Sequence, residues 1–356
     1  MDMRAKFPGS PVSAQEKARR ASLLFAFCPP VSSYPHSFPN MRATGFVLAG
    51  LLALANAIAL PEPGPETAAS SHSPSSSFLA RDLEARAPAC PDVWKLVNAD
   101  LNALFLEGGK CNALARGAIR ALFHDCGSWD QSQGLSGGCD GSLIAGVAPD
   151  VELDRIENRG LQSIAGALSD LAGKHNTTKA DMIIFAGNAA VFLCPGGPKV
   201  RTYIGRKDNT NSATRGGLPS PFDTPENLLA LFKAKGLDAE ALAALLGAHS
   251  TSTQSFVNAT QAGASQDSTP GELDVGYYKQ THDFATQGTA PAGVFVFPSD
   301  AGIATSAASS VGKWFQGFIG DQDKWSKSFK KSMERMALFG NDKGTMVDCT
   351  DAIAKL

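Results

Sequence analysis

The sequence lacks a strong charge of either sign. Its 32 Lys and Arg residues are opposed by 34 Asp and Glu residues, which leaves a formal net charge of −2. A protein that binds nucleic acid through phosphate contacts usually carries a clear basic excess. We therefore expect no nucleic-acid partner. The share of hydrophobic residues, 43%, is ordinary for a globular protein, so the chain is expected to fold.

The apolar segment at 45–60 is too short and too rich in alanine for a confident membrane span. A positive flank precedes it and the small-residue cleavage site Ala-Asn-Ala lies at 55–57, so it reads as a signal peptide at 41–57. A short buried helix is the alternative interpretation. Residues 1–40 would then be an over-extended leader, and 58–86 a pro-segment. We expect a secreted, extracellular protein with no membrane contact after processing.

Strand signals are sparse, and VFVF at 294–297 is the clearest of them. Seven segments instead place apolar residues three and four positions apart, which is typical of helices that bury one face. These segments lie at 93–105, 112–125, 161–175, 180–193, 225–236, 239–250 and 322–340. We predict an all-α fold with little β structure. A polar, Gly/Pro-rich linker at 210–220 would join two helical domains, at 87–210 and 221–356.

Seven cysteines in a chain that is expected to be secreted predict disulfides. One of them, Cys28, lies in the leader, and the residues alone leave the pairing of the other six open. Those six are Cys90, Cys111, Cys126, Cys139, Cys194 and Cys349. Sequons at Asn176 and Asn258 agree with passage through a secretory pathway and predict glycosylation there.

The stretch RALFHDC at 120–126 gathers chemically active side chains within two helical turns. Arg120 and His124 are four residues apart, so both project from one face of the predicted helix, with Phe123 close to it. A single helical histidine is more often a surface residue or a satisfied core residue. In the segment 239–250, however, His249 continues the buried leucine stripe. A buried neutral imidazole needs partners for its nitrogens, and a metal ion is one of them.

One helix with Arg and His and a second helix with a buried His indicate a flat cofactor between them, and haem fits this arrangement. His249 would bind the iron on one side, and Arg120 and His124 would face the open side. Such a pair suits peroxide, because the histidine can accept and return a proton while the arginine stabilises developing charge. An oxygen carrier would have little use for the arginine.

Oxygen-bearing residues cluster after both histidines. Asp125 and GGCDGS at 137–142 follow the first, and Ser250 and DSTPGELD at 267–274 follow the second. Carboxylates, hydroxyls and turn carbonyls are hard ligands that suit calcium. Each cluster by itself is equally consistent with a solvated turn, but the pairing with the two histidines favours two calcium sites.

From about residue 90 to its C-terminus, the chain resembles the plant-type haem peroxidase superfamily, and within it the secreted fungal (class II) peroxidases. RALFHDC is similar to the distal motif of that family, ELDRIENRGL to its Glu/Asn segment and LLGAHS to its proximal motif. The resemblance implies one haem b, a distal haem domain at 87–210 and a proximal haem domain at 221–356.

The resemblance also implies a role for each site residue. On the distal side these would be Arg120 as the distal arginine, His124 as the acid/base, Phe123 as the aromatic lid, and Asn158, paired with Glu152, as the group that fixes the tautomer of His124. On the proximal side they would be His249 as the iron ligand and Asp300, in FPSDAGIATS, as the carboxylate behind it.

Calcium ligands and disulfides follow from the same resemblance. The distal calcium would be bound by Asp125, the Gly138 carbonyl, Asp140 and Ser142. The proximal calcium would be bound by Ser250, Asp267, Thr269, the Glu272 carbonyl and Asp274. The implied disulfides are Cys90–Cys349 and Cys111–Cys194, which leaves Cys126–Cys139. That last bridge is more like those of plant secretory peroxidases than those of fungal ones.

Several positions depart from the specialised branches of the family. Manganese peroxidases bind Mn(II) with two glutamates and an aspartate, where this chain has Ala113, Gly117 and Ser255. Lignin and versatile peroxidases use an exposed tryptophan before the proximal histidine, where this chain has Ala244. Gln266 stands where an aromatic residue is expected near the proximal haem face. We therefore expect a generic peroxidase without a manganese site or a tryptophan relay.

The sequence thus predicts a secreted, monomeric haem peroxidase. It would use hydrogen peroxide to oxidise small phenols or other aromatic donors in one-electron steps at the haem edge. A secreted metallohydrolase built on His124, Asp125, Asp140 and His249 is an alternative, although it gives no role to the arginine or the proximal carboxylate. A second alternative is a calcium-stabilised binding protein that keeps the fold without the activity.

Overall fold

The structure, a computed structural model, describes residues 89–306 and 309–356. The predicted leader, signal peptide and pro-segment therefore lie outside the described residues, as does Cys28. The described residues all belong to one compact unit of the chain. Among them, no helix is long and apolar enough to cross a membrane.

The fold is mainly helical, as predicted. Its α-helices are α2 (Val93–Phe105), α3 (Ala113–Cys126), α4 (Ser142–Ala145), α5 (Gln162–His175), α6 (Lys179–Leu193), α7 (Pro225–Ala234), α8 (Ala239–Leu245), α9 (Gly276–Gln287), α10 (Pro298–Thr305), α11 (Ser310–Gly317) and α12 (Gln322–Met336). Its strands form two short antiparallel pairs, β1 (Leu106–Glu107) with β2 (Lys110–Cys111) and β3 (Tyr203–Ile204) with β4 (Val347–Asp348).

Each of the seven predicted helical segments lies on a helix, and local capping explains several of the boundaries. The Asn112 side chain accepts hydrogen bonds from two backbone N–H groups at the start of α3, and Thr224 does so once at the start of α7. The segment 239–250 is only partly α-helical, because α8 ends at Leu245 and continues as the 3₁₀ helix η4 (Leu246–Thr251).

The clearest strand signal, at 294–297, does not form a strand. Val294 forms a single bridge with Ser265, and the chain enters α10 at Pro298. Proline at the first helical position fixes the φ angle that a helix needs, so the helix start overrides the β propensity of the preceding residues.

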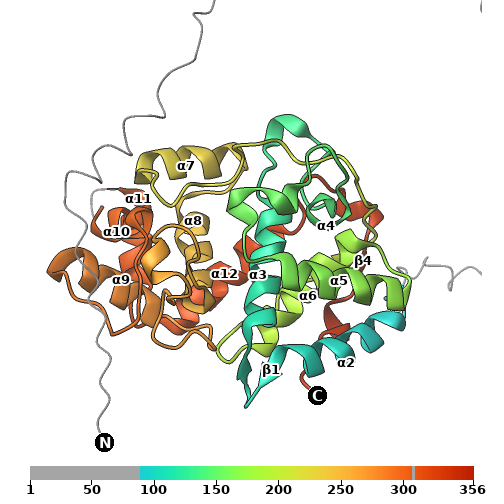
Figure 1. The fold of residues 1–356 in the computed structure, drawn as a ribbon, viewed down its shortest axis with the longest axis horizontal. Coiled ribbons are helices and arrows are strands. Elements are labelled where there is room, and N and C mark those ends of the chain that lie inside the picture. The colour runs from blue at the N-terminus through green and yellow to red at the C-terminus, as the bar shows by residue number, and fades with distance from the viewer. Residues whose placement is uncertain (1–88, 307–308) are drawn as a thin grey trace, which may run out of the picture. The chain divides into compact units, whose positions relative to one another are not determined.

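The helices form two groups, seen on either side of α3 in Figure 1. In one group α3 packs against α6, α5 and α2, and α6 is buried on almost all sides. In the other, α8 packs against α11 and α12, and α9 against α10. The segment η4 contacts α3, so the helix that carries RALFHDC faces the segment that carries the second histidine. Residues 205–224, between the groups, contain no helix or strand; the domain boundaries stay a prediction.

The three expected disulfides are present: Cys90–Cys349, Cys111–Cys194 and Cys126–Cys139. The first joins residues 259 positions apart and lies beside the β3–β4 pair, so it ties the C-terminal segment to the first helical group. The last closes a loop with a sequence separation of 13 directly after α3.

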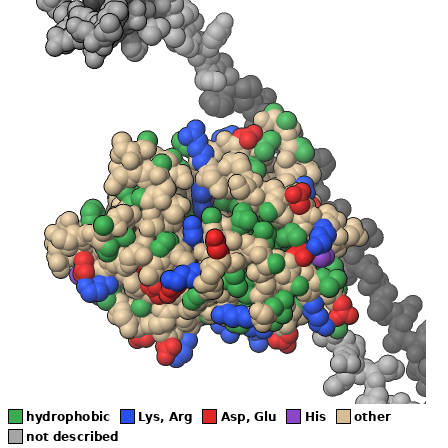
Figure 2. Space-filling model, turned by 60° about the horizontal axis from the view of Figure 1, so that its bottom comes forward, with side chains coloured by type: hydrophobic (Ala, Val, Ile, Leu, Met, Phe, Trp, Pro, Cys, Tyr) green, Lys and Arg blue, Asp and Glu red, His purple; other side chains and the backbone are tan. Residues whose placement is uncertain are grey.

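Charges of both signs are scattered over the face shown in Figure 2, with hydrophobic side chains between them. Both predicted glycosylation sites are reachable from solvent: Asn176 is exposed at the end of α5, and Asn258 is half-buried in a loop. Glycosylation, a monomeric state and the absence of a nucleic-acid partner remain predictions.

Candidate active site

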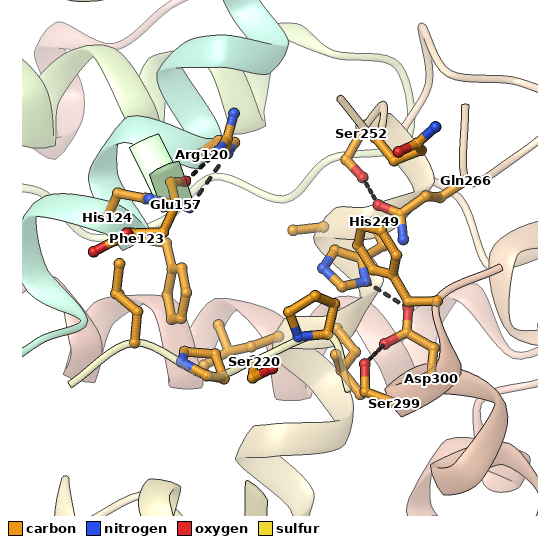
Figure 3. Close-up of a pocket in the computed structure, with 18 of the residues that line it drawn as sticks. Arg120, Phe123, His124, Glu157, Ser220, His249, Ser252, Gln266, Ser299 and Asp300 are labelled. Atoms are coloured by element: carbon orange, nitrogen blue, oxygen red, sulfur yellow. Dashed lines mark hydrogen bonds and ion pairs between the residues drawn. The ribbon is translucent and has the colours of Figure 1, made fainter. Parts of the chain in front are cut away.

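A cavity of about 610 Å³ lies between the two helical groups. Its volume is within the range of cofactor sites. Arg120, Phe123 and His124 line one wall from α3, and His249 lines the opposite wall from η4 (Figure 3). The structure therefore brings the distal and proximal residues predicted from the sequence to the same cavity.

On the distal wall, His124 is held at both ring nitrogens. Its Nδ1 lies 2.6 Å from the side-chain oxygen of Asn158, and its Nε2 accepts the Nε–H of Arg120 at 3.2 Å. The amide nitrogen of Asn158 donates to the backbone carbonyl of Glu152 at 2.6 Å, which leaves the amide oxygen to face the imidazole. The proton of a neutral His124 must then reside on Nδ1, so Nε2 is the unprotonated nitrogen and it faces Arg120.

The Glu152 carboxylate has a different partner, because it accepts a hydrogen bond from the backbone N–H of Ala213. The predicted Glu/Asn pair thus exists through the backbone carbonyl of Glu152. The carboxylate itself binds the segment between the two helical groups.

Burial lowers the pKa of His124 to about 3, and the charge of Arg120 acts in the same direction. Burial also lowers the pKa of Arg120 to about 10, which still leaves the guanidinium charged at neutral pH. Arg120 is fixed by donating to the backbone carbonyls of Glu157 and Arg159, at 2.6 and 2.8 Å. The distal wall therefore presents a neutral base beside a fixed cation, the combination that acid/base catalysis on peroxide requires.

On the proximal wall, Nδ1 of His249 lies 2.7 Å from Oδ2 of Asp300. Figure 3 shows the other ring nitrogen facing the cavity. Asp300 comes from the first turn of α10 and is only 1% exposed. Its contact with His249 was expected, but a second donor was not: the Tyr277 hydroxyl donates to the same oxygen at 2.8 Å.

Gln266 also lines the proximal part of the cavity and is only 1% exposed. Its amide oxygen accepts a hydrogen bond from the Ser252 hydroxyl, but its amide nitrogen has no partner in the structure. A buried donor of this kind usually has an acceptor, which here would be a bound group. An imidazole facing the cavity, an opposing Arg/His pair and the aromatic wall of Phe123 fit haem.

Several of the predicted calcium ligands lie close together, in two clusters. In the distal cluster, the fully buried Asp125 faces Asp140; burial and the Asp140 charge raise the pKa of Asp125 well above its ordinary value. In the proximal cluster, the Thr269 hydroxyl bridges Asp267 and Asp274 at 2.6 and 2.7 Å, and burial raises the pKa of Asp267. Between 89 and 356, with 307 and 308 left aside, no group of three or more His, Cys, Asp or Glu side chains could hold a metal ion.

Three buried oxygens in these clusters have no hydrogen-bond partner, and each belongs to a predicted calcium ligand. They are Oγ of Ser142, Oγ of Ser250 and Oδ2 of Asp267. Buried oxygens usually have a partner, and oxygens of this kind are ligands that suit a hard cation.

The structure does not support the metal site of the metallohydrolase alternative. His124 and His249 line the cavity, whereas Asp125 and Asp140 do not. The Asp125 carboxylate lies instead beside Asp140 in the distal cluster, where it accepts hydrogen bonds from the backbone N–H groups of Gly141 and Leu143. The four residues therefore do not meet around one metal ion.

Two of the positions that match the specialised family sites, Gly117 and Ala244, are unsuited to them. A Cβ placed on Gly117 would lie 3.1 Å from Ile164 Cγ2, so this position has little room for a glutamate. Ala244 is completely buried and cannot expose a relay side chain. Both Trp94 and Trp325 are buried as well. The other two tryptophans, Trp129 and Trp314, are half-buried.

Sequence reasoning missed three cavity-related residues. Tyr277, which reaches Asp300, lies on α9, a helix that was not among the predicted segments. Phe222 and Ile156 are exposed apolar residues that line the cavity. The adjacent tyrosines at 277–278 were the only local signal for Tyr277, because its hydrogen-bond partner, Asp300, lies on another helix.

Comparison with known proteins agrees with this geometry. The peroxidase family profile matches residues 97–321. Ligninase H2 of Phanerodontia chrysosporium is 31% identical over 301 residues, which cover 74% of this chain and 78% of that protein. Ligninase C of Trametes versicolor is 32% identical over 75% of this chain and 79% of its own length. Manganese peroxidase 3 of Phlebia radiata is 29% identical over 75% of this chain and 81% of its own length. The chain thus belongs to the plant-type peroxidase family, among its class II fungal members, and is a haem peroxidase.

Proposed function

We propose that this haem peroxidase is a secreted, generic enzyme that uses hydrogen peroxide to oxidise small phenols or similar aromatic donors. One observation carries the proposal: His124 and His249 line opposite walls of one cavity, and each is fixed through its far nitrogen, by Asn158 and Asp300 respectively. This arrangement leaves one nitrogen of each imidazole facing the cavity.

Each residue would have a defined task. His249 would bind the iron of one haem b, and Asp300 would orient it and add electron density. Bound haem would supply the redox chemistry. His124 Nε2 would accept a proton from one peroxide oxygen and return it to the other as water leaves. Arg120 would stabilise the negative charge that develops as the O–O bond breaks, and Phe123 would form the apolar lid.

The donor class is inferred from the cavity mouth. Phe222 is 64% exposed and Ile156 is 55% exposed, yet both line the cavity. Large apolar side chains that remain exposed beside a pocket often mark a binding surface. A flat aromatic donor could stack there and give up one electron, while the missing manganese ligands and tryptophan relay argue against Mn(II) or bulky polymers as donors.

Two calcium ions would hold the histidines in place. The distal ion would be bound next to His124 by the Asp125 cluster, and the proximal ion next to His249 by the Ser250 and Asp267 cluster. The orphaned oxygens of Ser142, Ser250 and Asp267 support this part of the proposal.

An absorption spectrum of the secreted, calcium-containing protein tests the proposal. We expect a ferric Soret band that changes on addition of hydrogen peroxide and returns after two equivalents of a phenol, with no return on addition of Mn(II). Return with Mn(II) alone would refute the donor assignment, and failure to take up haem would refute the whole. N-terminal sequencing and glycosidase treatment of the secreted protein test the processing near residue 87 and the glycans at Asn176 and Asn258.

A further inference from the structure

Asp300 forms hydrogen bonds with other side chains besides His249. Its Oδ2 lies 2.7 Å from Nδ1 of His249 and accepts the Tyr277 hydroxyl at 2.8 Å, while Ser299 donates to Oδ1 at 3.1 Å. His249, Tyr277 and Asp300 come from three elements, η4, α9 and α10, and α9 packs against both of the others. Tyr277 and Asp300 are each only 1% exposed.

Two donors on one oxygen compete for its negative charge. In the low-dielectric interior of a protein, two hydrogen bonds to the same oxygen influence each other strongly. The hydrogen bond from Tyr277 must therefore reduce the electron density that Asp300 can pass to His249. A hydrogen bond to a charged group is stronger than one between neutral groups, so the hydrogen bond from Tyr277 can alter the electronics of the imidazole.

Tyr277 also forms part of the wall around His249. The Tyr277 ring lies edge-on to the imidazole, with 5.8 Å between ring centroids and planes at 89°, and Phe297 stands on another side at 5.5 Å and 87°. A phenylalanine at position 277 would keep this wall. The hydroxyl therefore has a separate consequence, which acts through Asp300.

We propose that Tyr277 is a positioning residue of the peroxidase, whose hydroxyl shares the Asp300 oxygen with His249 and thereby limits the anionic character of the axial imidazole. A more anionic imidazole stabilises ferric over ferrous iron, so Tyr277 holds the reduction potential of the haem above the value that Asp300 alone would set. The inference rests on the proposed role of His249 as the iron ligand.

The adjacent Tyr278 provides a matched control. It is fully buried on the same helix, but its hydroxyl donates to the backbone carbonyls of Ala243 and Ala244 and not to Asp300. Tyr277→Phe and Tyr278→Phe each delete one buried hydroxyl. Only the first should change the state of His249.

The first measurement is the Fe(III)/Fe(II) midpoint potential of the haem-loaded full chain, by spectroelectrochemistry. We expect Tyr277→Phe to shift the equilibrium about tenfold toward the ferric state, which is about 59 mV more negative for one electron. The iron–imidazole stretching frequency of the ferrous protein should rise in the same variant. Tyr278→Phe should leave both unchanged. Equal shifts in the two variants, or none in Tyr277→Phe, would overturn the inference and leave the peroxidase assignment standing.

A second measurement needs no haem. In the haem-free full chain, the Nδ1 proton resonance of His249 should move downfield in Tyr277→Phe, because the His249–Asp300 hydrogen bond becomes stronger, and stay in place in Tyr278→Phe. If the chain took up no haem, the proposed function would fall, and this resonance would still decide whether Tyr277 acts on His249 through Asp300. An unmoved resonance would overturn the inference.

Discussion

The two walls of the cavity are built in different ways. On the distal wall, Arg120, Phe123 and His124 lie within two turns of one helix, and Asn158 is 34 residues from its partner His124. On the proximal wall, His249 is 51 residues from Asp300, and Tyr277 comes from a third element. The distal wall places an acid/base pair over the substrate, whereas the proximal wall holds one ligand through a chain of buried contacts. Local sequence can encode the first arrangement, but the second depends on the packing of α8, η4, α9 and α10.

The largest expected effects come from replacing the two histidines, and they differ between the two walls. We predict that His124→Leu keeps the haem but slows the reaction with hydrogen peroxide by about 10²–10⁴-fold, because the proton acceptor is gone. His249→Ala should instead lose most of the bound haem, because the axial ligand is gone. Stopped-flow kinetics and haem titration measure these outcomes. Haem loss in His124→Leu with retention in His249→Ala would reverse the assignment of the walls.

This contrast also shows how far the sequence can lead. Helical periodicity predicted α3 and the common face of Arg120 and His124, which the structure confirms with a hydrogen bond between them. The resemblance led to Asn158 and Asp300, both of which contact the expected histidines. Tyr277 escaped prediction because its helix, α9, is largely polar and its partner lies on another helix. A pattern within one element cannot reveal a hydrogen bond between two elements.

Calcium loss should affect the proximal wall more than the distal wall. The distal cluster lies beside the Cys126–Cys139 disulfide, which can hold the loop of Asp140 when the ion leaves. No disulfide joins the proximal segment 267–274, whose cluster includes Asp274. A free calcium concentration of about 100 times the Kd of one site stabilises the folded state by about 2.7 kcal/mol. We predict that Asp274→Asn lowers the thermal midpoint and alters the Soret band more than Asp140→Asn does.

Chelation provides the control for this comparison. EDTA removes both ions, so it should lower the thermal midpoint of the wild-type protein at least as far as Asp274→Asn does, and added calcium should fully restore only the wild type. A thermal midpoint that does not change on addition of EDTA, in the wild type or in either variant, would contradict the proposed calcium sites. A larger effect of Asp140→Asn would mean that the disulfide does not protect the distal loop.

A smaller effect is expected for the hydrogen bond behind the distal base. Asn158→Leu removes the acceptor for Nδ1–H of His124, so the imidazole can turn or change its tautomer, and the reaction with peroxide should slow by about 10–100-fold. The matched control is Asn188→Leu. Asn188 is equally buried on α6 but donates to Thr202 and not to the imidazole. Stopped-flow rates should fall in the first variant alone; equal losses would indicate a general disturbance of the first helical group.

The smallest expected effect concerns the mouth of the cavity, which neither wall provides. Phe222 belongs to the segment between the two helical groups and is 64% exposed, so a donor can cover only part of its apolar surface. We therefore predict that Phe222→Ala raises KM for a small phenol by about three- to tenfold, which is the magnitude of a modest apolar contact, and leaves the reaction with peroxide unchanged.

Leu135→Ala is the control, because Leu135 is similarly exposed but does not line the cavity. Steady-state kinetics with the phenol, next to stopped-flow kinetics with peroxide, separate the two steps. A change in the peroxide step would place Phe222 in the distal wall, and an unchanged KM would mean that donors approach elsewhere.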